Sequence, residues 1–119
     1  MVRGELVACP QFPTTLPTLD ELIGMDAITE ANVAEHLLQL TREPRDHVYT
    51  LHAELEGMKL APVFEKLLEG WKAQGYDLLS VGGLADRLNP ATFPLHSVVE
   101  EAVRGRSGKL AVQGLPFIL

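Results

Sequence analysis

The chain has 119 residues, of which 46% are hydrophobic and 22% charged, as in an ordinary globular domain. The formal net charge is −6 at pH 7 and the arginines form no long basic stripe, so a nucleic-acid partner is not expected. The single cysteine, Cys9, excludes an internal disulfide and any multi-cysteine metal site. Because the sequence shows neither a signal peptide nor an apolar run of about 20 residues, we expect one cytoplasmic domain over residues 1–119.

The N-terminal part is predicted to be a short strand followed by a loop and a helix start. An apolar stretch at residues 6–8 precedes three prolines, which disfavour helix and favour extended backbone. Thr18 and Glu21 have the spacing of a capping box, which predicts that a helix begins here. Taken alone, Asp20 and Glu21 need no further role than favouring that helix N-terminus.

Two amphipathic helices are predicted in the middle of the chain. The first begins near Thr29 and ends before Pro44, with apolar residues at three- and four-residue spacings. The second follows Gly57, accepts Pro62 in its first turn and ends at Gly75.

Runs rich in β-branched and aromatic residues predict strands at residues 48–52 and 76–81. Their order around the second helix predicts parallel pairing with a right-handed crossover. A short helix is expected around residues 84–88, after a glycine pair that breaks the chain. Residues 97–103 and 109–112 flank a glycine-rich turn and predict a hairpin, although residues 100–102 are equally compatible with a helix.

The best candidate for chemistry is His52, in the run Val-Tyr-Thr-Leu-His-Ala-Glu-Leu-Glu-Gly at residues 48–57. At the carboxyl end of a parallel strand, a titratable side chain can reach substrate from a rigid support. Side-chain alternation would put His52 and Glu54 on one face, and Glu54 or Glu56 could hold the ring in its protonated form. The alternative is a histidine that is only hydrogen-bonded structure, which is commoner for an arbitrary histidine.

A metal site built from this chain alone is not expected. His47 and His52 would point to opposite faces of a strand, while His36 and His96 lie on separate elements. The His-x-Glu pattern at His52 also occurs in zinc nucleobase deaminases, but these require a downstream Pro-Cys-x-x-Cys that this sequence lacks.

Two long stretches resemble a known family. Residues 11–24, Gln-Phe-Pro-Thr-Thr-Leu-Pro-Thr-Leu-Asp-Glu-Leu-Ile-Gly, and residues 48–57 resemble the C-terminal part of the undecaprenyl-phosphate 4-deoxy-4-formamido-L-arabinose deformylases. These enzymes are NodB-homology polysaccharide deacetylases of carbohydrate esterase family 4. The likeness continues through residues 63–88 and into the final hairpin, so it covers nearly the whole chain.

The resemblance implies an α/β fold: the C-terminal portion of a distorted parallel (β/α) barrel with a C-terminal β-hairpin. It implies a hydrolase in which a metal-bound water attacks the formamide carbon, and His52 falls on the histidine that protonates the departing amine. The loop at residues 15–21 would line the pocket near the sugar, with Thr15, Thr18 and Asp20 as its candidate residues.

The divalent metal of the family, zinc or similar, is held by an aspartate and two histidines in its N-terminal half, and a neighbouring aspartate there is the general base. Neither the metal ligands nor this base has a counterpart here. We therefore expect this chain alone to bind no metal and to be inactive. Exposed strand edges would lead to pairing with an N-terminal half or to self-association. The substrate would be a lipid-linked amino sugar used in lipopolysaccharide modification. Binding this lipid-linked substrate would place the protein in peripheral contact with the inner membrane. The alternative function is a non-catalytic relative that acts as an oligomeric or partner-binding module.

Overall fold

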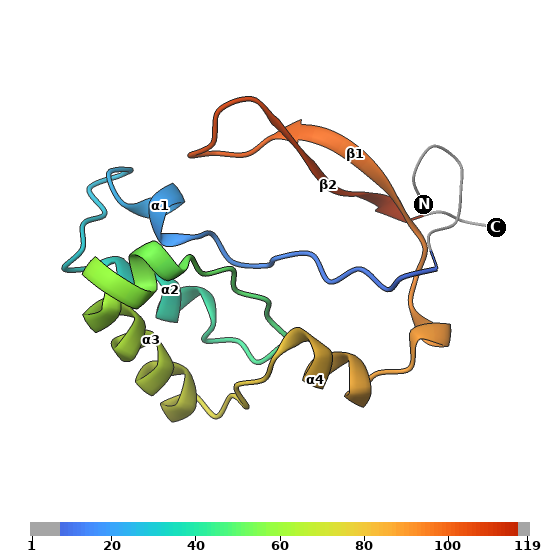
Figure 1. Cartoon of the computed structure of the whole chain (residues 1–119), viewed down its shortest axis with the longest axis horizontal. Coiled ribbons are helices and arrows are strands. Elements are labelled where there is room, and N and C mark those ends of the chain that lie inside the picture. The colour runs from blue at the N-terminus through green and yellow to red at the C-terminus, as the bar shows by residue number, and fades with distance from the viewer. Residues whose placement is uncertain (1–7, 117–119) are drawn as a thin grey trace. The chain divides into compact units, whose positions relative to one another are not determined.

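The computed structural model describes residues 8–116, which include helices and an antiparallel hairpin (Figure 1). The chain divides into two compact units, one of Thr14–Leu78 and the other of Met1–Pro13 with Leu79–Leu119. The strand predicted at residues 6–8 falls almost wholly outside the described residues. That residues 1–119 form a single domain remains a prediction.

The unit of Thr14–Leu78 begins with the short helix α1 (Leu19–Leu22), and its predicted capping box is confirmed. The Glu21 carboxylate accepts the backbone N–H of Thr18 at 2.9 Å. The N–H groups at the start of a helix have no acceptor within the helix, and the Glu21 carboxylate supplies one for Thr18.

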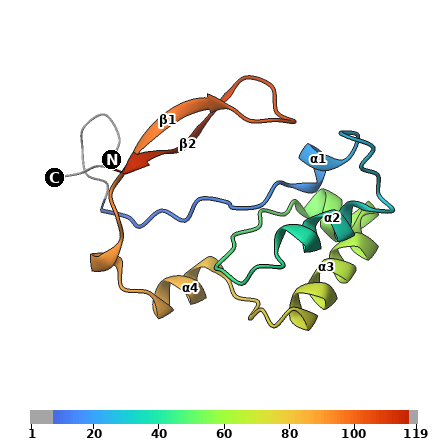
Figure 2. The same cartoon turned by 180° about the vertical axis from the view of Figure 1, so that it is seen from behind.

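The core lies between helices α2 (Val33–Leu40) and α3 (Ala61–Ala73), which run side by side (Figures 1 and 2). Gly70 permits close packing, since a β-carbon at this position would meet the side chain of Leu38. The apolar side chains of this core are Leu16, Leu19, Leu22, Ile28, Val33, Ala34, Leu37, Leu60, Val63, Leu67 and Trp71.

Helix α2 ends before Pro44 as predicted, but it begins at Val33 and not near Thr29. The Asn32 side chain accepts the backbone N–H of Thr29 at 2.8 Å, which favours a turn before the helix. Helix α3 confirms the second predicted helix, including Pro62 in its first turn.

A buried polar network ties the end of α2 to the end of α3. Thr41, 1% exposed, accepts a hydrogen bond from the indole N–H of Trp71 at 3.2 Å. Its hydroxyl donates to Gln74 Oε1 at 2.7 Å, and Tyr76 donates to its carbonyl oxygen at 2.7 Å. These contacts give the buried hydroxyl and the helix-terminal carbonyl their partners.

The strands predicted at residues 48–52 and 76–81 are wrong: neither segment has a strand assignment. The carbonyl of Val48 accepts N–H groups of Thr15 at 2.9 Å and Leu16 at 3.3 Å, but no ladder extends from this point. One reason is that the chain turns helical immediately after His52. Within residues 8–116 the sheet is an antiparallel pair, so the predicted parallel pairing is not observed.

The second unit contains α4 (Val81–Arg87), the 3₁₀ turn η2 (Pro90–Thr92) and strands β1 (His96–Ala102) and β2 (Lys109–Pro116). Helix α4 starts earlier than predicted because Ser80 caps it, accepting the N–H of Gly83 at 3.0 Å. The glycine pair therefore lies inside the first turn and does not break the chain.

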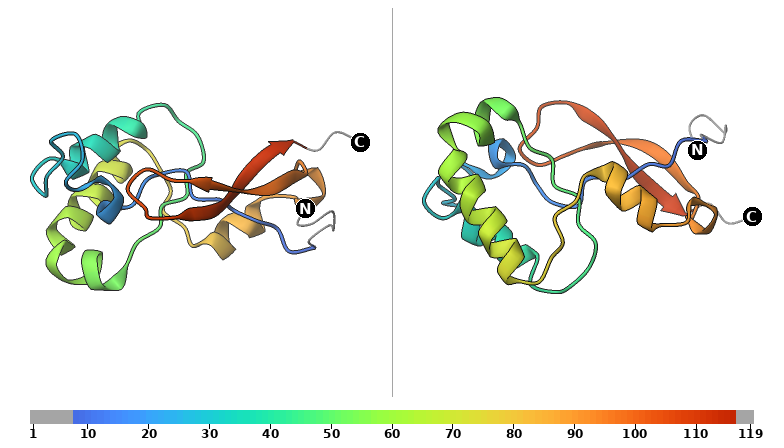
Figure 3. Two further views of the ribbon diagram at one scale, coloured as in Figure 1. Left: turned by 90° about the horizontal axis from the view of Figure 1, so that it is seen from above. Right: turned by 60° about the horizontal axis from the view of Figure 1, so that its bottom comes forward.

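Strands β1 and β2 form a twisted antiparallel hairpin, which confirms the prediction (Figure 3). Glu100 pairs with Ala111 and Glu101 with Leu110, so the helical alternative for residues 100–102 is wrong. No described residue of this unit is buried, and Leu115 is 82% exposed. The hairpin is held by its ladder and not by a core of its own.

Among the helices of residues 8–116, none is long and apolar enough to cross a lipid bilayer.

Replacing Gly75 with alanine is expected to lower the free energy of unfolding by about 1 kcal/mol, because Gly75 has φ +93° after the end of α3 and a β-carbon strains this conformation. Urea unfolding followed by circular dichroism measures the change. The control is Gly57→Ala, since Gly57 lacks a positive φ and an added β-carbon meets nothing within 4 Å. Equal stability of the two variants would contradict the prediction.

Candidate functional site

The two stretches that carry the family resemblance lie side by side in the structure. The backbone N–H of Thr15 donates to the Val48 carbonyl at 2.9 Å, and the Val48 N–H donates to Thr15 Oγ1 at 2.9 Å. Thr15 Oγ1 also lies 2.8 Å from Nδ1 of His47. The loop before α1 is therefore fixed against the segment that leads to His52.

His52 ends the extended segment and starts the next helical turn. Its carbonyl accepts the N–H groups of Leu55 at 2.9 Å and Glu56 at 3.0 Å. The expectation that His52 and Glu54 share one face of a strand is wrong, because Ala53 and Glu54 are already helical. Glu54 is exposed at the start of the π-helix η1 (Leu55–Lys59).

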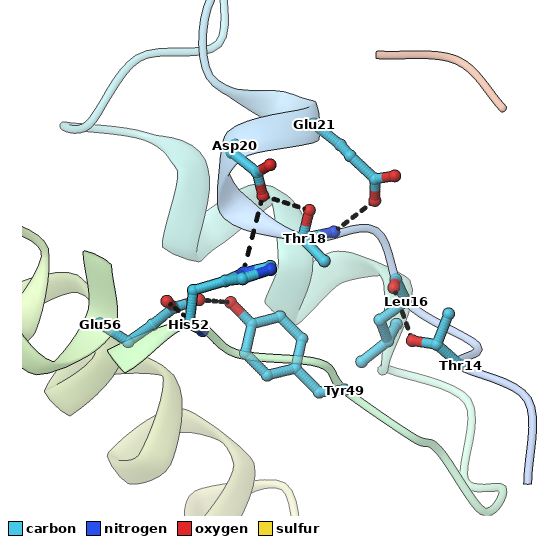
Figure 4. Close-up of polar contacts among 8 residues, drawn as sticks. All are labelled: Thr14, Leu16, Thr18, Asp20, Glu21, Tyr49, His52 and Glu56. Atoms are coloured by element: carbon cyan, nitrogen blue, oxygen red, sulfur yellow. Dashed lines mark hydrogen bonds and ion pairs between the residues drawn. The ribbon is translucent and has the colours of Figure 1, made fainter. Parts of the chain in front are cut away.

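The carboxylate on the ring side of His52 is that of Asp20, from the first turn of α1 (Figure 4). His52 Nδ1 lies 3.9 Å from Asp20 Oδ1, which is within ion-pair range for a protonated ring but too long for a hydrogen bond. Thr18 donates its hydroxyl hydrogen to the same Asp20 oxygen. Within the described residues, Nδ1 of His52 is buried without a hydrogen-bond partner, while the His52 side chain as a whole is 30% exposed.

Glu56 binds the backbone of His52. The sequence had suggested that Glu56 could lie beside the His52 ring. Glu56 is 1% exposed, and its Oε2 accepts the His52 N–H at 2.9 Å. Its Oε1 accepts the hydroxyl hydrogen of Tyr49 at 2.8 Å, so both carboxylate oxygens have donors (Figure 4). Sequence reasoning missed Tyr49; the signal was that a buried tyrosine needs a partner for its hydroxyl group.

Burial shifts two ionisable groups of this region. Burial, and then the hydrogen bond and charge of Glu56, raise the pKa of Tyr49 well above its ordinary value of 10.0. Burial, and then the charge of Arg45, lower the pKa of His47 from its ordinary value of 6.5, with Asp46 acting in the opposite direction.

The divalent metal implied by the resemblance does not fit this part of the chain alone. Across residues 8–116, no three His, Cys, Asp or Glu side chains gather as a metal site would require. His52 and Asp20 offer one nitrogen and one carboxylate. The arrangement places an imidazole ring beside a carboxylate, and both are groups that can take part in proton transfer.

Tyr49→Phe is expected to cost about 2 kcal/mol of unfolding free energy at neutral pH, since it removes a hydrogen bond to the buried Glu56 carboxylate. Above about pH 10 the unfolded tyrosine ionises while the folded one stays protonated, so the wild type loses stability as pH rises. The difference in unfolding free energy between the wild type and Tyr49→Phe should therefore become smaller above pH 10. Urea unfolding from pH 7 to pH 11 measures it, and a constant gap would argue against the raised pKa.

In the His47→Asn variant, the free energy of unfolding is expected to fall less on acidification than it does in the wild type. As the pH falls below about 6.5, the unfolded chain takes up a proton at His47 that the folded chain resists, so unfolding becomes more favourable. The asparagine amide can still form a hydrogen bond with Thr15 Oγ1 in either direction, but it cannot titrate. Urea midpoints between about pH 5 and pH 7.5 test this. His36→Asn, on α2, is the histidine control, and equal flattening in both variants would contradict the assignment to His47.

Comparison with known proteins identifies relatives, although no protein-family model matches the chain. It is 35% identical over 109 residues to the probable 4-deoxy-4-formamido-L-arabinose-phosphoundecaprenol deformylase ArnD of Shewanella sediminis (strain HAW-EB3), which covers 92% of this chain and 35% of that protein. It is 29% identical over 103 residues to the protein of the same name from Wigglesworthia glossinidia brevipalpis, covering 87% of this chain and 36% of that protein.

The chain thus spans about a third of the length of these curated relatives. The matches nevertheless cover most of the present sequence. The resemblance is confirmed: this chain is a relative of the ArnD deformylases.

Proposed function

We propose that this chain forms the proton-donor side of a deformylase active site that releases the formyl group from a lipid-linked amino sugar. The relatives are named as deformylases of 4-formamido-arabinose joined to phosphoundecaprenol, which supports this substrate class. The observation that carries the proposal is the placement of the partly exposed His52 ring 3.9 Å from the Asp20 carboxylate, where the two resembling stretches meet.

His52 acts as the general acid. Hydrolysis of a formamide adds water to the carbonyl carbon and breaks the C–N bond, giving formate and an amine. An unprotonated amine is a very poor leaving group, so the His52 imidazolium delivers its proton to the nitrogen as that bond breaks and becomes neutral. Asp20 provides an ion-pair partner for the imidazolium before the transfer.

Other residues of the site have supporting roles. Thr18 orients Asp20 through its hydroxyl group, and Thr15 holds the loop against Val48. Glu54, exposed beside His52, remains a candidate for contact with the sugar. A divalent metal and the general base implied by the resemblance would be held by groups outside residues 8–116.

The complete domain has the NodB-type (β/α) barrel, with this chain as its C-terminal portion. The segments at residues 48–52 and 76–80 would become strands once neighbouring strands supply hydrogen-bond partners. The exposed apolar side chains of Val98, Leu110 and Leu115 support a missing partner, either an N-terminal half or a second copy. The protein would work in the cytoplasm, in peripheral contact with the inner membrane through its lipid-linked substrate.

His52→Ala is expected to lower deformylase activity about 100-fold or more, the usual contribution of a general acid. The full chain is co-expressed with the N-terminal part of an ArnD relative, and formate release from the formamido sugar is measured. His36→Ala, which removes a histidine on α2, should leave activity unchanged. Full activity in His52→Ala would contradict the proposed role.

A second candidate is a non-catalytic module that binds a partner or a second copy. It is favoured by the absence of a metal-ligand cluster within residues 8–116 and by the exposed hairpin side chains. A stable complex with the N-terminal part that releases no formate would favour this candidate over the enzyme.

A further inference from the structure

Glu56 is a charged side chain in a place where an apolar one would be less costly. It is 1% exposed, beside a core otherwise built mainly from leucine, valine and tryptophan. Burying a carboxylate is unfavourable unless its oxygens are hydrogen-bonded, and apolar replacements of similar volume are often as stable. Stability alone therefore does not explain this residue, and its two hydrogen bonds indicate what else it does.

One of these bonds fixes the backbone of His52. Glu56 Oε2 accepts the His52 N–H at 2.9 Å, while the His52 carbonyl accepts from Leu55 and Glu56. Both backbone polar groups of His52 are thus bound to the following turn. With the backbone held in this way, only the side-chain torsions remain to place the ring beside Asp20.

The other bond connects this turn to the hydrophobic core. Glu56 Oε1 accepts from Tyr49, whose ring packs edge-on against Trp71 with centroids 5.3 Å apart. Trp71 in turn donates to Thr41 at the end of α2. A continuous series of contacts therefore connects His52, through Glu56, Tyr49 and Trp71, to the core between α2 and α3.

The local backbone is also unusual. Glu56 lies in η1, a π-helical turn in which the N–H of Leu60 bonds to the carbonyl of Leu55 at 2.8 Å. Such turns are rare and are frequently found at functional sites. Here the turn carries the carboxylate that reaches back to both Tyr49 and His52.

We propose that Glu56 is a positioning residue for His52: its buried carboxylate holds the His52 backbone so that the ring faces Asp20. The proposal rests on the proposed role of His52 as proton donor. Glu56 acts through His52 and does not itself transfer a proton to the substrate.

The test replaces the polar pair with an apolar one in the full chain. Tyr49→Phe/Glu56→Leu removes the carboxylate together with the Tyr49 hydroxyl group that it would leave unpaired. The His52 N–H then loses its acceptor, and this loss is the change under test. Tyr49→Phe is the matched control, because it keeps the bond from Glu56 to the His52 N–H. Glu65→Leu, an exposed glutamate on α3, controls for loss of a charge.

Nuclear magnetic resonance reads out the position of His52 directly. In the double variant, amide exchange at His52 should accelerate about tenfold or more, as expected when a hydrogen bond to a charged group is lost. Cross-relaxation between the His52 ring and the Asp20 side chain should disappear, while that between α2 and α3 remains. Both controls should keep the contact of His52 with Asp20.

Persistence of the contact between His52 and Asp20 in the double variant would overturn the proposal. So would its loss together with the contacts of α2 and α3, since this would show a merely structural role. If the double variant does not fold, Glu56→Asp replaces it. That carboxylate is one methylene shorter and cannot reach both donors, so the contact of His52 with Asp20 should weaken several-fold, and an unchanged contact would overturn the proposal.

Activity with the co-expressed N-terminal part gives a second measurement. The double variant should lower kcat about tenfold or more relative to Tyr49→Phe without changing KM, because substrate binding is retained while proton delivery is misaligned. Equal kcat values would overturn the proposal. An inactive wild-type complex counts against the proposed function, and the magnetic resonance result then decides whether Glu56 positions His52.

Discussion

The buried carboxylate of Glu56 is the contact on which the candidate site depends. It accepts one hydrogen bond from the backbone of His52 and another from Tyr49, which packs on Trp71 in the core. A carboxylate in such a place is tolerated only because both oxygens have donors. Since Glu56 and both donors lie within residues 49–56, a local segment carries its own connection between core and site.

The remaining geometry follows from the packing of α2 against α3. This core includes Leu16 and Leu19, so it also fixes the loop that carries Thr15, Thr18 and Asp20. The contacts of Thr15 with His47 and Val48 then bring two stretches that lie some thirty residues apart to the same place. An imidazole ring beside a carboxylate is the result of this packing.

The chain matches about a third of the length of its deformylase relatives. Its two units differ in their packing. The unit of Thr14–Leu78 has a core, a polar network and the candidate proton donor. The described part of the other unit has no buried side chain, and its hairpin is held by backbone pairing. The two units therefore differ in what holds them together: a hydrophobic core in one, and a backbone ladder in the described part of the other.

Local patterns in the sequence were sufficient for the capping box of Thr18, for helix α3 with Pro62 and Gly75, for the hairpin, and for the resemblance that pointed to His52. These features depend on hydrogen bonds and periodicity within a few residues, which the sequence contains directly. Residues 48–52 were mistaken for a strand because a strand exists only when a partner pairs with it, and composition does not say whether one is present. Only the tertiary structure decided that Asp20 faces the His52 ring, because the packing of the core brings these two groups together from separate elements. It also decided that Glu56, four residues after His52, binds the His52 backbone, because the chain turns helical there and the carboxylate is buried beside this N–H.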